Sequence, residues 1–136
     1  MHKILTFFFI FGLLVGCSKD ENSDTSTGTS ALTDIKSLTD YDATIQSGVS
    51  LIFFHATWCS ICSAQRPNVE GLSGNTSITG AKLGQVDTDK NKDIINKYSV
   101  SGQPVIIIYK NNVEKHRLLG QGHSKEKLAD LIKALL

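Results

Sequence analysis

The sequence has little proline, little cysteine and no excess of charge of either sign. Its 136 residues include two Pro, three Cys and one Trp, and 14 Lys and Arg stand against 13 Asp and Glu, a formal net charge of +1. This balance argues against nucleic acid as a partner, because nucleic-acid binding needs a basic face. Three cysteines are too few for a disulfide framework. The length and the 40% content of hydrophobic residues fit one globular domain, which we expect to be a monomer.

The sequence also lacks a hydrophobic run of about 20 residues, the length that spans a membrane. The run Ile4–Val15 has twelve residues and follows Lys3, which suits the hydrophobic part of a secretory signal. It ends at Gly16-Cys17 and resembles the bacterial lipoprotein signal, in which a cysteine becomes the lipidated N-terminus. We therefore predict a lipoprotein signal peptide at residues 1–16 and a lipid on Cys17. An ordinary cleaved signal and an uncleaved anchor remain alternatives.

Residues 17–30 contain mostly small and polar side chains. After Cys17 this segment is rich in Ser, Thr, Asp and Asn and has no large apolar residue, so it cannot bury enough surface to order itself. We predict a flexible tether that holds a domain at residues 31–136 off the bilayer. The expected location is the bacterial cell envelope, anchored to a membrane by lipid, with the domain in the periplasm or on the cell surface.

The cysteines at 59 and 62 follow an apolar run, Leu51–Phe54, and precede a segment with helical character. The free N–H groups and the dipole at a helix start favour a thiolate there. We interpret Cys59 as an exposed nucleophile and Cys62 as its partner one turn further inside. A zinc half-site and an inert buried pair are the alternatives. Zinc needs further N or S ligands, and the rest of the domain offers only the histidines at 55, 116 and 123, so we predict no metal.

The remaining pattern alternates between strands and helices. Continuous apolar runs predict buried strands, and apolar residues at helical spacing predict amphipathic helices. We place a capping box at Thr39, a cap for the third helix at Asp87 or Asp89, and a last helix after Ser124. The predicted strands are 33–38, 49–56, 81–86, 105–109 and 114–119, and the first two predicted helices are 39–46 and 59–72. This order predicts a central sheet with helices on both faces.

The order, together with several local motifs, resembles the thioredoxin family from about Thr33 to Leu136. Ala56-Thr57-Trp58-Cys59 is similar to the family's Ala-x-Trp-Cys, and Pro67 stands five residues after the second cysteine, where the family kinks its helix. The segment Tyr98–Val105 is similar to the one that carries the family's cis-proline. The resemblance implies an α/β, thioredoxin-like fold with a central mixed sheet flanked by helices on both faces.

The same resemblance implies a set of site residues. Cys59 and Cys62 would be catalytic, and Trp58, Gln103 and Pro104 would shape the surface on which a substrate docks. It implies no cofactor other than a redox-active Cys59–Cys62 disulfide. The implied partners are protein disulfides or dithiols and a membrane electron carrier.

Two positions depart from the family pattern. Phe53 stands where the family usually has a buried Asp that accepts a proton from the inner cysteine, so proton transfer must use water or another group. His55 stands where the family has an aromatic residue; we expect it to pack or to face solvent, although it could tune Cys59 electrostatically. The pair Ser60-Ile61 between the cysteines leaves the direction of the net reaction open.

The sequence therefore predicts a membrane-tethered, extracytoplasmic thiol–disulfide oxidoreductase that reduces protein disulfides. A disulfide donor is the first alternative. A surface lipoprotein that uses the fold as a binding module, with a vestigial cysteine pair, is the second.

Overall fold

The computed structural model describes residues 31–136, so the predicted signal peptide, Cys17 and the tether lie outside the described residues. A five-stranded sheet has the order β1-β3-β2-β4-β5. The strands are β1 (Thr33–Asp34), β2 (Val49–His55), β3 (Lys82–Asp87), β4 (Val105–Lys110) and β5 (Val113–Leu119). The helices are α1 (Leu38–Ile45), α2 (Ser60–Glu70), the 3-10 turn η1 (Thr76–Ile78), α3 (Lys92–Lys97) and α4 (Lys125–Lys133). The predicted α/β class and mixed sheet are confirmed.

Strand β2 lies at the centre of the sheet. It pairs in parallel with β3 and antiparallel with β4, while β1 runs parallel to β3 and β5 runs antiparallel to β4. All seven residues of β2 are buried, as expected for a strand covered on both faces. Because the side chains of a strand alternate between faces, β2 supplies both hydrophobic cores and carries the chain to the cysteine pair at its carboxyl end.

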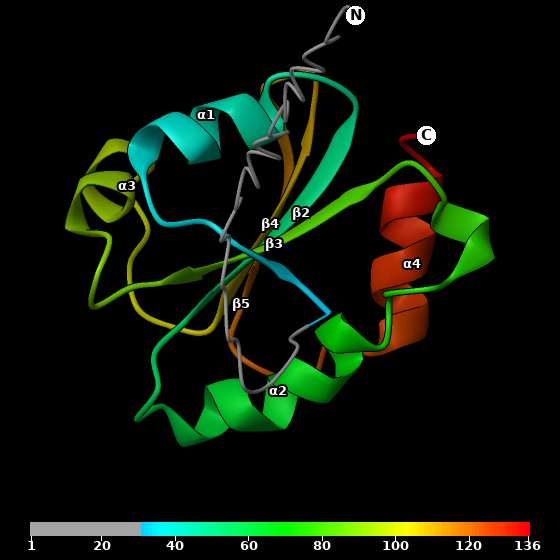
Figure 1. The fold of residues 1–136 in the computed structure, drawn as a ribbon. Coiled ribbons are helices and arrows are strands. Elements are labelled where there is room, and N and C mark those ends of the chain that lie inside the picture. The colour runs from blue at the N-terminus through cyan, green and yellow to red at the C-terminus, as the bar shows by residue number, and fades with distance from the viewer. Residues whose placement is uncertain (1–30) are drawn as a thin grey trace, which may run out of the picture.

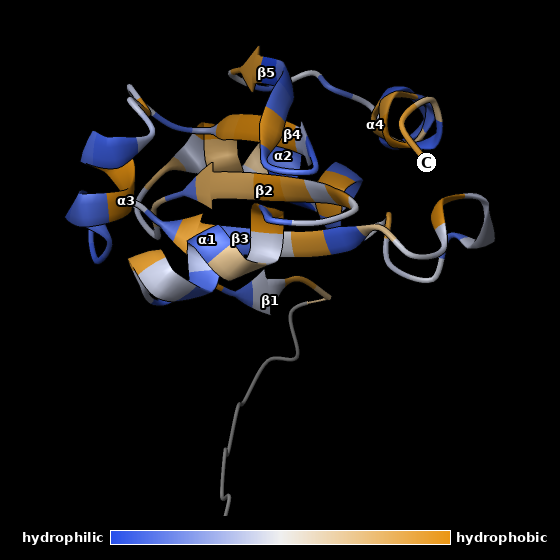
Figure 2. Cartoon of the chain, turned by 90° about the horizontal axis from the view of Figure 1, so that it is seen from above, coloured by the Kyte–Doolittle hydropathy of each residue, from blue (hydrophilic) through white to orange (hydrophobic). Residues whose placement is uncertain are grey.

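Two hydrophobic cores lie on opposite faces of the sheet (Figure 1). The α2/α4 core contains Leu51, Phe53, Cys59, Cys62, Val69, Leu72, Ile106, Ile108, Leu128 and Ile132, among others. The α1/α3 core contains Tyr41, Ile45, Ile52, Phe54, Val86, Ile94, Val105, Ile107 and Tyr109, among others. Figure 2 shows the hydrophobic residues concentrated along β2 and β4, between the flanking helices.

Two predicted helix caps are wrong. Helix α1 begins earlier than predicted, and its N-cap is Ser37, whose Oγ accepts a hydrogen bond from the N–H of Asp40 at 3.1 Å. Strand β1 is also shorter than the predicted strand 33–38, since it ends at Asp34 and residues 35–37 belong to neither a strand nor a helix. The N-cap of α3 is Asn91, which makes no side-chain cap hydrogen bond. Asp87 Oδ1 instead accepts from the N–H of Asp89 at 2.9 Å. Ser37 therefore caps α1 in place of Thr39, whereas no side chain caps the start of α3.

Other local predictions are confirmed. Ser124 caps α4, since its Oγ accepts from the N–H of Lys127 at 3.2 Å. Asn111 and Asn112 adopt φ values of 49° and 66° in the turn between β4 and β5, a backbone region that asparagine tolerates better than most residues. Pro67 lies inside α2 as expected. Within residues 31–136, no helix is both long and apolar enough to cross a membrane.

Candidate redox site

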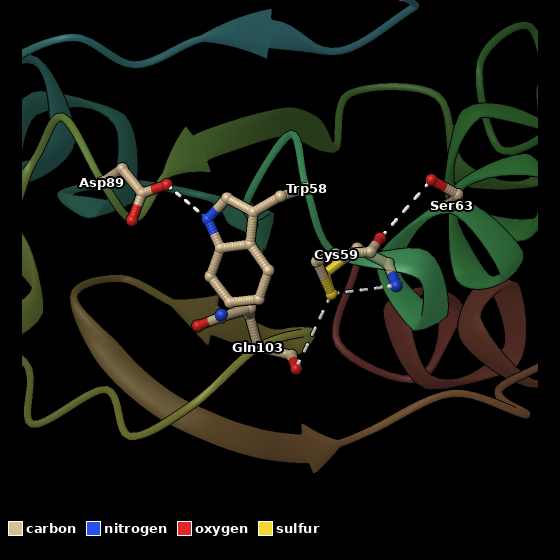
Figure 3. The surroundings of a disulfide bond; sticks show 6 residues. Trp58, Cys59, Ser63, Asp89 and Gln103 are labelled. Carbon is tan, nitrogen blue, oxygen red and sulfur yellow. Dashed lines mark hydrogen bonds between the residues drawn. A yellow bond between two sulfur atoms is a disulfide. The ribbon is translucent and has the colours of Figure 1, made fainter.

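The cysteine pair lies where β2 ends and α2 begins. Cys59 is the N-cap of α2, with extended backbone, and its Sγ accepts a hydrogen bond from the N–H of Cys62 at 3.2 Å. The two sulfurs form a disulfide, with 5.2 Å between the Cα atoms (Figure 3). The Sγ of Cys59 therefore already accepts from one of the free N–H groups of the first turn, and the helix dipole adds to the stabilisation of negative charge there.

Both cysteines are buried in the disulfide form. Cys59 is 5% exposed and Cys62 is 2% exposed, and both belong to the α2/α4 core. The expectation that Cys59 is exposed is therefore wrong, because its side chain packs in this core. The Cys59 Sγ lies 4.0 Å from the carbonyl oxygen of Gln103 (Figure 3). The peptide bond between Gln103 and Pro104 is cis. The structure thus brings the two cysteines, Gln103 and Pro104 together, as predicted.

The Trp58 side chain is exposed beside the cysteine pair and is fixed by one hydrogen bond. Its side chain is 68% exposed, and its indole Nε1–H donates to Asp89 Oδ2 at 2.7 Å (Figure 3). The loop that carries Asp89 is tied to the end of β2, since the N–H of Thr88 donates to the His55 carbonyl at 2.8 Å. Sequence reasoning read Asp89 as a possible helix cap. Its contact with Trp58 spans 31 residues, and no local pattern indicates such a contact.

Two further apolar residues near the site were missed. Ile61 is 42% exposed on the first turn of α2, and Leu119 is 64% exposed at the end of β5. Leu119 pairs with Val105, and the next residue, Gly120, donates its N–H to the Pro104 carbonyl at 2.9 Å. The sequence could have indicated them, since both are large apolar residues near the ends of predicted elements. Exposed apolar side chains around a buried disulfide suit the docking of an extended peptide.

A stack of three side chains lies below the helix, on the same face of the sheet as the cysteines. The ring of Phe53, fully buried, stacks on the imidazole of His55 with centroids 5.5 Å apart, and the Arg66 guanidinium lies 5.3 Å from the Phe53 centroid. Arg66 Nη1 donates to Gln85 Oε1 at 2.8 Å and to Glu70 Oε1 at 3.0 Å. His55 therefore packs, as expected. Its burial, followed by the Arg66 charge, lowers its pKa below the ordinary histidine value.

The loop after β5 is fastened to α2 by Gln65. This side chain is fully buried, three residues after Cys62, and its Nε2 donates to the His123 carbonyl at 2.7 Å while its Oε1 accepts from the His123 N–H at 3.1 Å. The two bonds join α2 to the chain that follows Leu119. Among residues 31–136 there is no group of three or more His, Cys, Asp or Glu side chains that could hold a metal ion.

Comparison with known proteins agrees with this geometry. The thioredoxin family model matches residues 32–134. The chain belongs to the thioredoxin family. A thioredoxin from Staphylococcus epidermidis is 34% identical over 93 residues, which cover 68% of this chain and 88% of that protein.

Solved thioredoxin structures have the same fold. The thioredoxin of Fasciola hepatica superposes with a TM-score of 0.67 at 26% identity and covers 77% of this chain and all of its own. A mutant thioredoxin from Halobacterium salinarum gives a TM-score of 0.68 at 26% identity, covering 81% of this chain and 96% of its own.

Family membership and the linked cysteine pair make the chain a thiol–disulfide oxidoreductase that acts on protein disulfides. Enzymes of this family need no cofactor beyond the redox-active disulfide. The individual roles of Cys59, Cys62, Trp58, Gln103 and Pro104 stay predictions.

Proposed function

We propose that the protein is a membrane-tethered, extracytoplasmic thioredoxin-like reductase of protein disulfides, with Cys59 as the nucleophile. The position of Cys59 at the N-terminus of α2, with Cys62 bonded to it and the Gln103 carbonyl 4.0 Å away, carries this proposal. The helix start favours the Cys59 thiolate, and the Gln103–Pro104 segment offers backbone groups beside it to an extended substrate peptide.

The reaction has two exchange steps. The Cys59 thiolate attacks one sulfur of the substrate disulfide, forms a mixed disulfide and expels the other substrate sulfur as a thiolate that takes up a proton. Cys62 then loses its proton and attacks Cys59, which forms the Cys59–Cys62 disulfide and releases the second substrate thiol. The substrate gains two electrons and two protons, which the enzyme's dithiol supplies.

The cellular setting rests on the sequence before the described residues. A lipid on Cys17 would hold the domain at a membrane of the bacterial cell envelope, with the domain in the periplasm or on the cell surface. Extracytoplasmic compartments are oxidising, so the dithiol must be regenerated from elsewhere, and a membrane electron carrier with its own cysteines is the partner we propose.

A trapping experiment tests the chemistry. Cys62→Ser should accumulate substrate proteins linked to Cys59, because the second step is blocked, and the double variant Cys59→Ser/Cys62→Ser should trap none. Trapping by Cys59→Ser alone, through Cys62, would contradict the assigned order. A chain with a vestigial pair would neither trap substrate nor turn over a small disulfide.

A fractionation experiment tests the setting. The wild-type protein should be found with membranes and incorporate labelled fatty acid, and Cys17→Ser should lose the label and leave the membrane fraction. A wild-type protein that carries no label would contradict the lipid anchor.

One observation favours a second candidate, a disulfide donor. No carboxylate stands at position 53, and the Arg66 guanidinium lies over the Phe53 ring. A buried carboxylate beside the pair would repel the thiolate of the reduced form. Because none stands at position 53, the reduced form is more stable, which makes the disulfide more oxidising. The reduction potential separates the two candidates: a value near about −270 mV is typical of thioredoxin, and one near about −120 mV is typical of a strong donor.

A further inference from the structure

Residues 99–104 join α3 to β4 and lie beside the redox site. Their Gln103 carbonyl oxygen lies 4.0 Å from the Cys59 Sγ. The backbone N–H groups of residues 101–103 have no hydrogen-bond partner among residues 31–136, and the side chain of Ser101 is exposed. The path of this segment past the cysteine pair therefore depends on the bonds that hold its two ends.

Strand β5 holds both ends of the segment. At the end that enters β4, the Gly120 N–H donates to the Pro104 carbonyl at 2.9 Å. At the other end, Arg117 Nη2 donates to the Tyr98 carbonyl at 3.0 Å, and Arg117 Nη1 donates to the Ser99 carbonyl at 3.1 Å. Tyr98 is the C-cap of α3, and the last carbonyl groups of a helix lack partners within it and favour a cation nearby. One guanidinium group thus fixes the point where the helix ends and the segment begins.

Glu114 orients this guanidinium group. Arg117 Nε and Nη2 each donate to one carboxylate oxygen of Glu114 at 2.8 Å, and such a bidentate pair fixes the plane of the guanidinium. The bond to the Ser99 carbonyl acts where the backbone needs support. Ser99 has a φ of 51°, a left-handed conformation that residues other than glycine keep when their surroundings hold it. Arg117 is therefore a side chain that keeps the first turn of the segment in place.

We propose that Arg117 positions residues 99–104 for the docking of protein substrates and so sets the affinity for them. The proposal rests on the proposed function, because it names the residue that holds the segment on which the substrate docks. An extended peptide can pair with the backbone beside Gln103 at low cost only if that backbone is already in place. When the bonds to Tyr98 and Ser99 are lost, residues 101–103 must be ordered at each docking event, which costs conformational entropy. A small disulfide makes few contacts with the segment and does not carry this cost.

Steady-state reduction of insulin by the full chain, with dithiothreitol to regenerate the dithiol, separates docking from chemistry. Arg117→Ala should raise the KM for insulin about tenfold and leave kcat within about twofold, the result expected when one further residue must be ordered on docking. The rate with Ellman's reagent, a small disulfide, should stay at the wild-type value. Arg117→Lys should recover part of the loss in KM, because an ammonium group can donate to a carbonyl but lacks the guanidinium fork.

Lys115→Ala is the matched control, since Lys115 is an exposed cation on the same strand and no described hydrogen bond or ion pair joins it to residues 98–104. It should keep the wild-type KM and kcat. The inference is overturned if Arg117→Ala keeps the wild-type KM for insulin. It is also overturned if the rates with insulin and with Ellman's reagent fall by the same factor, as a purely structural role would predict.

Urea unfolding shows whether Arg117→Ala folds. If it does not, Glu114→Ala carries the test, because it removes the carboxylate that orients Arg117 and should raise the KM for insulin in the same direction. A wild-type KM in that variant would overturn the inference. A wild-type protein that does not reduce insulin would overturn the proposed function instead.

Discussion

The two faces of the sheet bury polar groups in different ways. On the α1/α3 side, the Tyr41 and Tyr109 hydroxyls bond to each other at 2.8 Å, and the Tyr98 hydroxyl donates to Asp42 Oδ1 at 2.5 Å. The rings of Tyr41 and Tyr98 pack with centroids 4.4 Å apart. On the α2/α4 side, Phe53 of the same strand β2 lies in one core with the two cysteines, and the oxygen atom facing the Cys59 Sγ is a backbone carbonyl.

This difference separates stability from chemistry. The tyrosine cluster satisfies its hydroxyls within the protein, and burial raises the pKa of Tyr41, so its proton is fixed at all physiological pH values. The cysteine pair sits in an equally buried place, but its bonds must be broken and remade in each cycle. We expect substitutions on the α1/α3 side to change the free energy of unfolding and those at the cysteine pair to change the rate.

The largest expected effect is a loss of activity without a loss of stability, at the cysteine pair. Cys59→Ser should lower the rate of disulfide reduction by at least about 10³-fold, because a hydroxyl is a far weaker nucleophile than a thiolate. Serine is a good N-cap, so its Oγ can replace the Sγ that accepts from the Cys62 N–H. The free energy of unfolding, measured with urea, should match that of the reduced wild type. A large loss of stability would mean that the cysteine side also carries the fold.

The second-largest expected effect is a loss of stability without a loss of activity, on the α1/α3 side. Tyr41→Phe leaves the Tyr109 hydroxyl buried without its described partner, which should cost about 1–3 kcal/mol of unfolding free energy. The rate of disulfide reduction should remain at the wild-type value. The double variant Tyr41→Phe/Tyr109→Phe is the control, because it removes both hydroxyls and should be more stable than the sum of the two single losses predicts.

The third effect lies at the edge of the site. Asp89→Ala removes the acceptor of the Trp58 indole and should raise the KM for a protein disulfide a few-fold, with kcat little changed, since a freed ring loses entropy on docking. Trp58 is the only tryptophan in the chain, so fluorescence anisotropy reports directly on its mobility. Asp89→Asn keeps an acceptor oxygen and should restore both readings. Wild-type anisotropy in Asp89→Ala would show that this bond does not hold the ring.

The sequence predicted what depends on local pattern and missed what depends on distant partners. The strand β2 and the helix start at Cys59 follow from apolar runs and spacing. The similarity of Tyr98–Val105 to the family's cis-proline segment predicted that Gln103 and Pro104 belong to the site. The bonds from Trp58 to Asp89 and from Gln65 to His123 join residues 31 and 58 positions apart, so no spacing rule indicates them.

The smallest effect tests whether the α1/α3 side also responds to pH. A hydrogen bond and ion pair with Lys97 at 2.8 Å, helped by the Tyr98 hydroxyl, lower the pKa of Asp42. A carboxyl with a lowered folded-state pKa stabilises the protein above its ordinary pKa and loses this contribution as the pH falls through the folded value. Asp42→Asn should therefore be less stable at pH 7 by about 0.2–1 kcal/mol, the usual range for an exposed pair, and this gap should close in strong acid. Urea unfolding of both proteins at several pH values measures it, and a gap that stays constant into strong acid would mean that the pair contributes nothing through its charge.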